Sequence, residues 1–444
     1  MTRSETIPTD KASRITLGLL GRFLNGEAAR QVGVRLWDGT RWPDGQERRV
    51  TLLLNHPGAL RRMFLPGTEI GLCEAYLYND FDIIGDIEAL FALADEVASV
   101  SGGRLVRLRL ARDLLRLPAG SRRDVRGREH ARLRGRRHSI ERDRQAIAYH
   151  YDVSNDFYAL WLDSRMVYSC AYFPTPDVDL ETSQECKLDY ICRKLRLRPG
   201  QRLLDIGCGW GALVMHAAQH YGVQAVGITL SRPQALLANE RIAQAGLAGR
   251  CCIEVRDYRE VDEPEGYDAL ASVGMFEHVG ETLLSTYFTQ AMRLLRPGGL
   301  FLNHGTARQA TDPPARGPNF TNTYVFPDGE LVPVSTSLGI AEAVGFEVRD
   351  VESLREHYAL TLRHWVRRLE ATHDRALRFV DEPTFRVRRL FMSRAAHGFT
   401  VGRLNVYQAL LAKPGPKGLV SLPLTRADLY AESLMSHAPG HHEG

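Results

Sequence analysis

An α/β fold with a doubly wound parallel sheet, preceded by a smaller α/β domain, is predicted from three features of the sequence. The chain has 444 residues, which is more than one hydrophobic core usually supports. Its composition, 44% hydrophobic and 25% charged, is typical of globular proteins and excludes extended disorder. Strand and helix patterns alternate over residues 145–412, and this order builds parallel sheets.

Residues 1–103 carry the patterns of the smaller α/β domain. We expect strands at Val34–Trp37 and Val50–Leu54, and helices at Glu69–Tyr78 and Ile87–Val97. No cluster of catalytic residue types occurs in this domain, which favours a role in packing, substrate presentation or formation of a homodimer. The first residues, MTRSETIPTDKASR, lack the apolar core of a signal peptide, so a cytoplasmic protein is expected.

An arginine-rich segment, residues 104–144, separates the two domains. It contains fifteen arginines, no lysine and five acids, a net charge of +10, so the rest of the chain sums to −6 and the whole chain to +4. Its first part, RLVRLRLARDLLRL, sets leucines at helical intervals among arginines, which is typical of a basic amphipathic helix at an anionic membrane surface. The second part, with Gly120, Gly127 and Gly135, indicates a flexible linker, and a solvated linker is the alternative for the whole segment. Nucleic acid is not expected as a partner, because no aromatic residues interleave with the arginines.

Residues 145–412 are expected to form the larger domain, a Rossmann-like sheet with helices on both faces. Ligands of such sheets bind outside the carboxyl ends of the strands, and a loop with five prolines, residues 311–336, is expected to fold over that edge. Residues 413–444 are expected to be a loosely ordered tail. The expected elements are strand Arg202–Ile206, helix Gly211–Tyr221, strand Ala225–Ile228, helix Pro233–Ala245, strand Cys252–Val255, strand Tyr267–Val273, helix Glu281–Leu295 and strand Leu300–Asn303.

Cysteine usage and hydropathy narrow the class of protein further. The seven cysteines include no CxxC pair, which argues against a disulfide framework or a zinc ribbon and suits a reducing compartment. No metal site is expected, and the tail histidines His437, His441 and His442 are interpreted as solvated. The uncharged stretch Ile206–Ser231 contains five glycines, so it is interpreted as buried strand, turn and helix and not as a membrane span.

The strongest motif is the glycine-rich turn Leu203-Leu204-Asp205-Ile206-Gly207-Cys208-Gly209-Trp210-Gly211. Its glycines stand at every second position after an acid that ends a strand, a spacing that differs from the dinucleotide fingerprint and from the P-loop. Glycine lets the backbone turn tightly and approach a ligand closely, while the next helix presents its N-terminal amides to the same place. The turn resembles motif I of class I S-adenosylmethionine (SAM) methyltransferases. The resemblance implies that Asp205, Gly207, Gly209 and Gly211 bind SAM.

Two later turns supply further candidates for the cofactor site. Most methyltransferases hold the ribose hydroxyls with an acid after the second strand, but this chain has Gly227-Ile228-Thr229-Leu230-Ser231-Arg232-Pro233-Gln234 there. Thr229 and Gln234 are expected to make those hydrogen bonds instead. After the third strand, Asp257 is expected to accept from the adenine amine, with Tyr258 packed beside it. As isolated residues, all four also fit an ordinary surface loop.

Over most of its length the sequence resembles the cyclopropane fatty acid synthases and the related mycolic acid cyclopropane synthases. Five segments carry the resemblance: residues 150–158 (HYDVSNDFY), residues 168–173 (YSCAYF), residues 274–280 (GMFEHVG), His304 at the end of the fifth strand, and His357-Tyr358 in a later helix. The resemblance implies a bicarbonate ion as catalytic base, held by Cys170, Glu277, His304 and Tyr358. It further implies Tyr151 and Tyr168 beside the SAM sulfonium and Phe173 near the acyl chain. Each of these residues alone also fits a structural role, as a buried thiol, a helix N-terminal acid, a core histidine or a packed aromatic ring.

The resemblance implies a SAM-dependent enzyme that acts on the cis double bond of an unsaturated fatty acyl chain, expected within membrane phospholipid. A cyclopropane acyl chain is the expected product. The alternatives are a methylene or methyl-branched chain made from the same carbocation with a partner reductase, a small-molecule N-methyltransferase, and a lipid-binding protein with an inactive methyltransferase domain. Beside a lipid-modifying site, the segment 104–144 is expected to contact the anionic inner face of the cell membrane, which makes the protein peripheral to that membrane.

Overall fold

The computed structural model describes residues 10–24, 28–99, 104–120, 130–151, 153–313 and 317–430. The first part of the chain folds around a four-stranded sheet of order β2-β1-β3-β4, in which β1 and β3 are parallel and the other pairs antiparallel. Its elements are α1 (Lys11–Phe23), η1 (Ala28–Gln31), β1 (Val32–Arg35), β2 (Arg41–Trp42), β3 (Val50–Leu54), α2 (Ala59–Phe64), α3 (Glu69–Leu77), β4 (Phe81–Gly85), α4 (Glu88–Ser99) and α5 (Arg104–Leu115).

A seven-stranded sheet of order β10-β11-β9-β8-β5-β6-β7 forms the larger part of the fold. The strands β5 to β9 are parallel to their neighbours, whereas β11 runs antiparallel between β9 and β10. The α/β fold class predicted from the sequence is confirmed, and the antiparallel β11 is an addition to the predicted parallel sheet. The strands are β5 (Arg202–Ile206), β6 (Gln224–Thr229), β7 (Cys251–Val255), β8 (Tyr267–Val273), β9 (Leu295–Arg308), β10 (Glu347–Ser353) and β11 (Leu404–Ala412).

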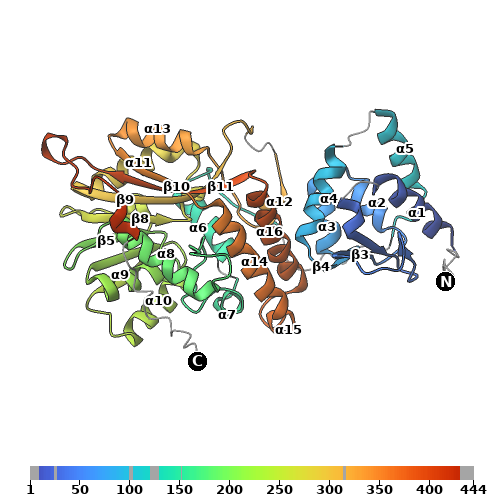
Figure 1. Ribbon diagram of the computed structural model, residues 1–444, viewed down its shortest axis with the longest axis horizontal. Coiled ribbons are helices and arrows are strands. Elements are labelled where there is room, and N and C mark those ends of the chain that lie inside the picture. The colour runs from blue at the N-terminus through green and yellow to red at the C-terminus, as the bar shows by residue number, and fades with distance from the viewer. Residues whose placement is uncertain are drawn as a thin grey trace, which may run out of the picture.

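Helices cover both faces of this sheet, as Figure 1 shows. Alternate residues of β5 are buried on opposite faces, since Leu203 packs with α8, α9 and α10 and Leu204 packs with α11 and α13. The helical elements are α6 (Ile140–Tyr151), α7 (Asn155–Ala159), α8 (Leu180–Lys194), α9 (Ala212–Tyr221), α10 (Arg232–Gln244), η2 (Tyr258–Glu260), η3 (Phe276–His278), η4 (Glu281–Leu283), α11 (Leu284–Leu294), α12 (Phe320–Tyr324), α13 (Val334–Val344), α14 (Arg355–Ala371), α15 (His373–Ala376), α16 (Glu382–Thr400), η5 (Pro416–Gly418) and α17 (Ala427–Tyr430).

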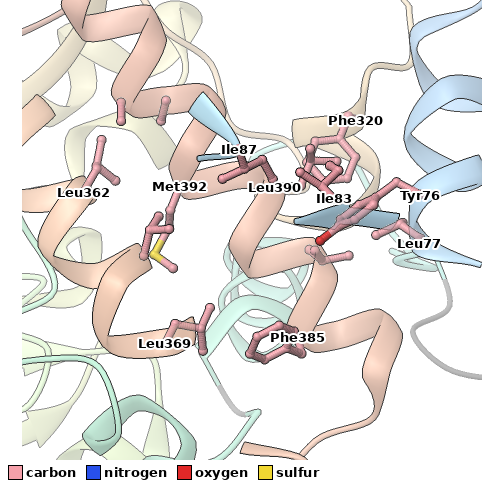
Figure 2. Close-up of a cluster of buried hydrophobic side chains, with 14 of the residues drawn as sticks. Tyr76, Leu77, Ile83, Ile87, Phe320, Leu362, Leu369, Phe385, Leu390 and Met392 are labelled. Carbon is pink, nitrogen blue, oxygen red and sulfur yellow. The ribbon is translucent and has the colours of Figure 1, made fainter. Parts of the chain in front are cut away.

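The two sheets are joined through α14 and α16, which lie between them (Figure 1). Figure 2 shows Tyr76 of α3 and Ile83 of β4 beside Leu390 and Phe385 of α16, and all belong to one buried cluster. Charged groups frame this apolar contact. Arg386 of α16 donates to the carbonyl oxygen of Tyr76 (2.9 Å) and pairs with Asp82 (3.0 Å).

Further contacts of the same two helices reinforce the junction. Arg389 of α16 donates to the Tyr76 hydroxyl (3.0 Å), and Arg363 of α14 pairs with Glu88 of α4 (2.6 Å). Because the first of these arginines is buried and held by several partners, its contacts fix orientation as well as proximity. The smaller sheet is therefore packed against the helices of the larger part.

The arginine-rich segment falls into two parts with different surroundings. Helix α5 lies against α1 and α2, with Leu108 and Leu115 exposed to 66% and 55%. Closer to α6 the arginines form internal ion pairs, with Arg142 bonded to Asp328 (2.5 Å) and Arg144 to Glu260 (3.2 Å). Gly127 and the side chains of Arg104 and Arg107 lie outside the described part. Within the described residues, no helix combines the length and apolar character needed to cross a membrane.

The expected tail begins after β11. Lys413 donates to the carbonyl oxygens of Met292 and Leu295 (2.8 and 2.7 Å), and Leu429 of α17 is buried at 4% exposure. Val420, Leu422 and Leu429 of the tail therefore contact the larger part of the fold, whereas Leu419 and Leu424 are exposed. The three tail histidines at 437, 441 and 442 lie outside the described residues.

Candidate active site

A cavity opens at the carboxyl ends of β5, β6 and β8, where a doubly wound sheet places its ligands. Its empty volume is about 1150 Å³, counting the part open to solvent. Nine of the ten residues predicted to bind the cofactor line its wall: Tyr151, Tyr168, Asp205, Gly207, Gly209, Thr229, Gln234, Asp257 and Tyr258. The tenth, Gly211, lies outside the lining as the N-cap of α9.

The glycine turn after β5 forms the floor of the cavity. At Gly207, both the backbone conformation and the nearness of Met275 exclude a side chain. Gly207 has φ +81°, and a Cβ built on it would lie 2.6 Å from the Cβ of Met275. The amides of Gly207 and Cys208 both donate to the carbonyl oxygen of Ile228 (2.9 and 3.0 Å), which fixes the turn to β6. Gly211, with φ +79°, packs against Ala238 and serves helix packing.

At one end of the cavity, a buried acid and a buried amine lie together. Burial raises the pKa of Asp205 from its ordinary value of 3.8 to about 7, although nearby Lys187 lowers it. Burial also lowers the pKa of Lys187 to about 8, and its Nζ donates to Ser169 Oγ (2.9 Å). Oδ1 of Asp205 has no hydrogen-bond partner among the described residues. One acceptor and one cation side by side match the ammonium and carboxylate of an amino acid.

Another part of the cavity wall is built on Arg259, to which the sequence analysis assigned no role. Arg259 bonds both oxygens of Asp257 (2.7 and 2.6 Å) and reaches Asp143 of α6 (2.8 Å). The carboxylate of Asp257 is thus fixed in direction, and α6 is fastened across the cavity. Thr229 and Gln234 meet in a hydrogen bond of 2.9 Å between Oγ1 and Oε1, so this predicted pair forms one polar patch of the wall.

Two tyrosines that line the cofactor cavity, Tyr151 and Tyr168, are also electrostatic neighbours of Tyr358. The ring centroids of Tyr151 and Tyr168 lie 6.1 Å apart at 82°, and Tyr168 further contacts Trp161 and Trp365. The electron-rich faces of aromatic rings attract a cation, and the rings do not hold water molecules beside it. This arrangement suits both a sulfonium and a carbocation.

Three of the four predicted catalytic residues share one electrostatic neighbourhood. The hydroxyl of Tyr358 lies among Tyr168, Glu277 and Cys170, and burial raises its pKa. Burial likewise raises the pKa of Glu277. The hydrogen bond that its Oε1 accepts from the Thr306 amide (2.7 Å) lowers the pKa, but by less than burial raises it. Oε2 of Glu277 is buried without a hydrogen-bond partner among the described residues. Burial also raises the pKa of Cys170, which keeps the thiol protonated.

The fourth residue, His304, approaches from the sheet. It is 1% exposed, and burial lowers its pKa far below the ordinary value, helped by the nearby charge of Lys187. Lys187 is thus an electrostatic neighbour of both His304 and Cys170. The Nε2 atom of His304 is buried without a partner in the described part of the chain.

The predicted substrate residue Phe173 lies outside the cavity wall, on the side of α14. Its ring stacks on His364 with centroids 5.6 Å apart, and its amide donates to Nδ1 of His357 (3.0 Å). Phe173 is buried at 5% exposure. It therefore forms part of an apolar layer next to Cys170 and Tyr172.

Sequence reasoning missed three residues of the site: Lys187, His278 and Arg259. Lys187 and Lys194 stand seven residues apart in α8, on the same face as Leu188 and Ile191, and two lysines on an apolar face were an available signal. His278 lines the cavity, and burial lowers its pKa to about 4. Nothing in the local sequence distinguishes Arg259 from a surface arginine, since its partners come from distant segments.

The fold and the cavity define a class of protein, that of the class I SAM-dependent methyltransferases. The family model of mycolic acid cyclopropane synthetase matches residues 138–409. A probable fatty acid methyltransferase of Pseudomonas putida is 40% identical over 401 residues, covering 89% of this chain and 95% of that protein. The cyclopropane-fatty-acyl-phospholipid synthase of Escherichia coli K12 is 35% identical over 270 residues, covering 61% and 68%.

A solved structure agrees with these sequence relationships. The crystal structure of the mycolic acid cyclopropane synthase CmaA1 with SAH and CTAB has a TM-score of 0.57 at 33% identity, covering 61% of this chain and 98% of that one. The chain therefore belongs to the mycolic acid cyclopropane synthase family, and the resemblance stated from the sequence is confirmed. It is a SAM-dependent methyltransferase of that family.

The substitution Gly207→Ala is expected to abolish tight SAM binding. A Cβ at this position would collide with Met275, so the floor of the cavity would have to move; the expected loss is at least about tenfold in affinity by calorimetry. Gly246→Ala is the matched control, because Gly246 also has positive φ but nothing lies within 4 Å of its Cβ position. Equal SAM affinity for the two variants would contradict the assignment of this turn.

The substitution Asp205→Asn is expected to stabilise the SAM-free protein while weakening SAM binding. The folded-state pKa lies near 7 and the ordinary value is 3.8, so ionisation destabilises the folded state increasingly as the pH rises from about 4 to 7. The gain in unfolding free energy should be about 2 kcal/mol larger at pH 8 than at pH 5, measured by thermal melts. Asp374→Asn, at a fully exposed side chain, should change neither property, and a pH-independent gain for Asp205→Asn would refute the raised pKa.

Proposed function

We propose that the protein transfers a methylene from SAM to the cis double bond of an unsaturated fatty acyl chain and forms a cyclopropane ring. The observation that carries this proposal is the pair of buried polar atoms Glu277 Oε2 and His304 Nε2, which are unpartnered among the described residues, with Glu277 and Cys170 as electrostatic neighbours of Tyr358. A buried polar atom without a partner is uncommon and calls for an explanation, such as a catalytic role or a bound water or ion. An N-methyltransferase does not need such a cluster next to its SAM, because an amine attacks the methyl group directly and no carbocation forms.

The reaction follows from the electron demand of the two substrates. The π electrons of the alkene attack the methyl carbon on sulfur, the carbon–sulfur bond breaks, and S-adenosylhomocysteine leaves. The positive charge then rests on the neighbouring carbon, and loss of a proton from the new methyl group closes the ring. The rings of Tyr151 and Tyr168 face this space and stabilise positive charge, and the dry surroundings keep water from capturing the cation.

The cluster fits a small anion such as bicarbonate. The buried thiol of Cys170 and the ring N–H of a neutral His304 are donors, and a raised pKa favours the protonated, donating form of Glu277. These groups and Tyr358 would hold the anion, which supplies the base for the proton of the new methyl group. The protein residues therefore bind and orient the anion and exclude water, while burial keeps them from acting as strong bases themselves.

Membrane phospholipid is the proposed source of the acyl chain. The relative from Escherichia coli bears the name of a fatty-acyl-phospholipid synthase, and α5 offers an exposed pair, Leu108 and Leu115, next to Arg109, Arg112 and Arg116. The two leucines are seven residues apart and share a helix face. We propose that this face contacts an anionic membrane.

A second candidate product is supported by a relative whose match covers 89% of this chain. That protein from Pseudomonas putida is named a fatty acid methyltransferase, without mention of a ring. A 1,2-hydride shift can move the positive charge of the same carbocation onto the carbon that bears the new methyl group. Loss of a proton from that methyl group then leaves an exocyclic methylene, which a partner reductase would convert to a methyl branch. The two products differ in whether a double bond remains.

The proposed reaction is tested with SAM and vesicles of cis-monounsaturated phospholipid, followed by gas chromatography and mass spectrometry of the fatty acids. A gain of one CH₂ with a ring supports cyclopropanation, and an added carbon with a retained double bond supports the second candidate. Glu277→Gln should lower kcat at least about 100-fold with SAM affinity intact, whereas Glu240→Gln, exposed on α10, should be neutral. Unchanged lipids together with methylation of an amine would overturn the proposal.

The membrane contact is tested by neutralising α5. The triple substitution Arg109→Gln, Arg112→Gln and Arg116→Gln should weaken binding to anionic vesicles at least about tenfold, because each surface cation contributes about 1 kcal/mol. The control removes three exposed arginines elsewhere, Arg198, Arg250 and Arg375. If both triple variants lose binding equally in vesicle sedimentation, the contact is not specific to α5.

A further inference from the structure

Behind His304 lies a row of buried polar contacts that the reaction described above does not use. His304 of β9 and Gln408 of β11 are register partners, and Nε2 of Gln408 lies 3.3 Å from Nδ1 of His304. The Oε1 atom of the same amide accepts from Lys194 Nζ (2.8 Å). Lys194 in turn pairs with Glu352 of β10 (2.5 Å), which also accepts from the hydroxyl of Tyr190 (2.9 Å).

The chemistry of these groups determines the direction of each hydrogen bond. An ammonium only donates, so the atom of Gln408 that faces Lys194 must be the carbonyl oxygen. The amide nitrogen then faces His304, and because it only donates, Nδ1 of His304 must accept. A neutral imidazole that accepts at Nδ1 carries its proton on Nε2.

Burial keeps this row free of competition from water. Gln408 is 0% exposed and the Lys194 side chain 1% exposed, and His304 is held neutral by burial and by the two lysines nearby. The Nε2 atom that must carry the proton is the one buried without a partner among the described residues. The donor is therefore aimed away from the row, on the same strand whose Thr306 amide bonds Glu277.

We propose that Lys194 and Gln408 are positioning residues that hold His304 in its Nε2–H tautomer and so present a hydrogen-bond donor to the reaction site. This inference deepens the proposed function and rests on it for the role of His304 in turnover. Lys194 fixes the orientation of the Gln408 amide, and Gln408 fixes the tautomer and the ring plane of His304. An outer group that selects the tautomer of a catalytic histidine is a known way to set its role.

The tautomer is measured directly by ¹⁵N NMR of protein labelled at histidine, with His304 assigned from the signals lost in His304→Gln. The wild-type protein should show a protonated Nε2 and an unprotonated Nδ1. In Gln408→Glu, the carboxylate accepts from Nδ1–H, so Nδ1 should become protonated and kcat should fall at least about 30-fold with SAM affinity unchanged. A wild-type spectrum with the proton on Nδ1 overturns the proposal without any variant.

Variants at Lys194 separate positioning from a loss of structure. Lys194→Met leaves the amide free to rotate, so both tautomers should appear, whereas Lys194→Arg retains a group that only donates and should restore the Nε2–H form. Tyr190→Phe removes a bond one step farther along the row and should leave the tautomer unchanged. A loss of kcat in Gln408→Glu with the Nε2–H tautomer intact would refute the positioning role.

The two proposals can fail separately. The NMR measurement needs no lipid and no turnover, so a tautomer that switches as expected supports the row even if the wild-type protein leaves every lipid unchanged. A wild-type protein that leaves every lipid unchanged would overturn the proposed function. A tautomer that does not switch, in a protein that cyclopropanates lipid, overturns only the positioning role.

Discussion

The buried amine of Lys187 is the group on which the arrangement of the site depends. It is 2% exposed, donates to Ser169, and has Asp163, Cys170 and Asp205 as its electrostatic neighbours. A buried ammonium persists only where acids and acceptors surround it, so it draws the end of β5 and the segment before α8 to one point. Asp205 of the cofactor cavity and Cys170 of the predicted catalytic set thus have this buried amine as a common neighbour.

Desolvation explains why the remaining groups of the cluster are neutral. The same burial raises the pKa of Cys170 and of Tyr358 and lowers that of His304. A carbocation survives only where water and strong nucleophiles are absent, and neutral thiol, phenol and imidazole groups meet that demand. The surroundings that protect the cation therefore also deprive the protein of its own strong base, which is the chemical reason for proposing that a bound anion accepts the proton.

The sequence was sufficient for the parts of the fold and site that depend on local pattern. Alternating strands and helices predicted the parallel sheet, and the spacing of Gly207 and Gly209 predicted the glycine turn that lines the cavity. Strands β10 and β11 were not predicted. β11 pairs with β9, which lies about a hundred residues earlier in the chain, and both new pairings are antiparallel. Arg259 and Lys187 were missed for a related reason. Their roles arise from partners on distant segments, which no local pattern encodes.

Helices α14 and α16 connect the smaller sheet to the catalytic cluster. The ring of Tyr358 in α14 packs on Phe399 of α16, with centroids 4.7 Å apart, and the opposite side of α16 binds the smaller sheet through Arg386 and Arg389. Buried residues on both sides of this helix pair belong to one cluster (Figure 2). Since a close-packed core transmits displacement, the docking of the smaller sheet bears directly on the position of Tyr358. The N-terminal part of the chain is therefore a structural support of the site as well as the proposed contact with the membrane.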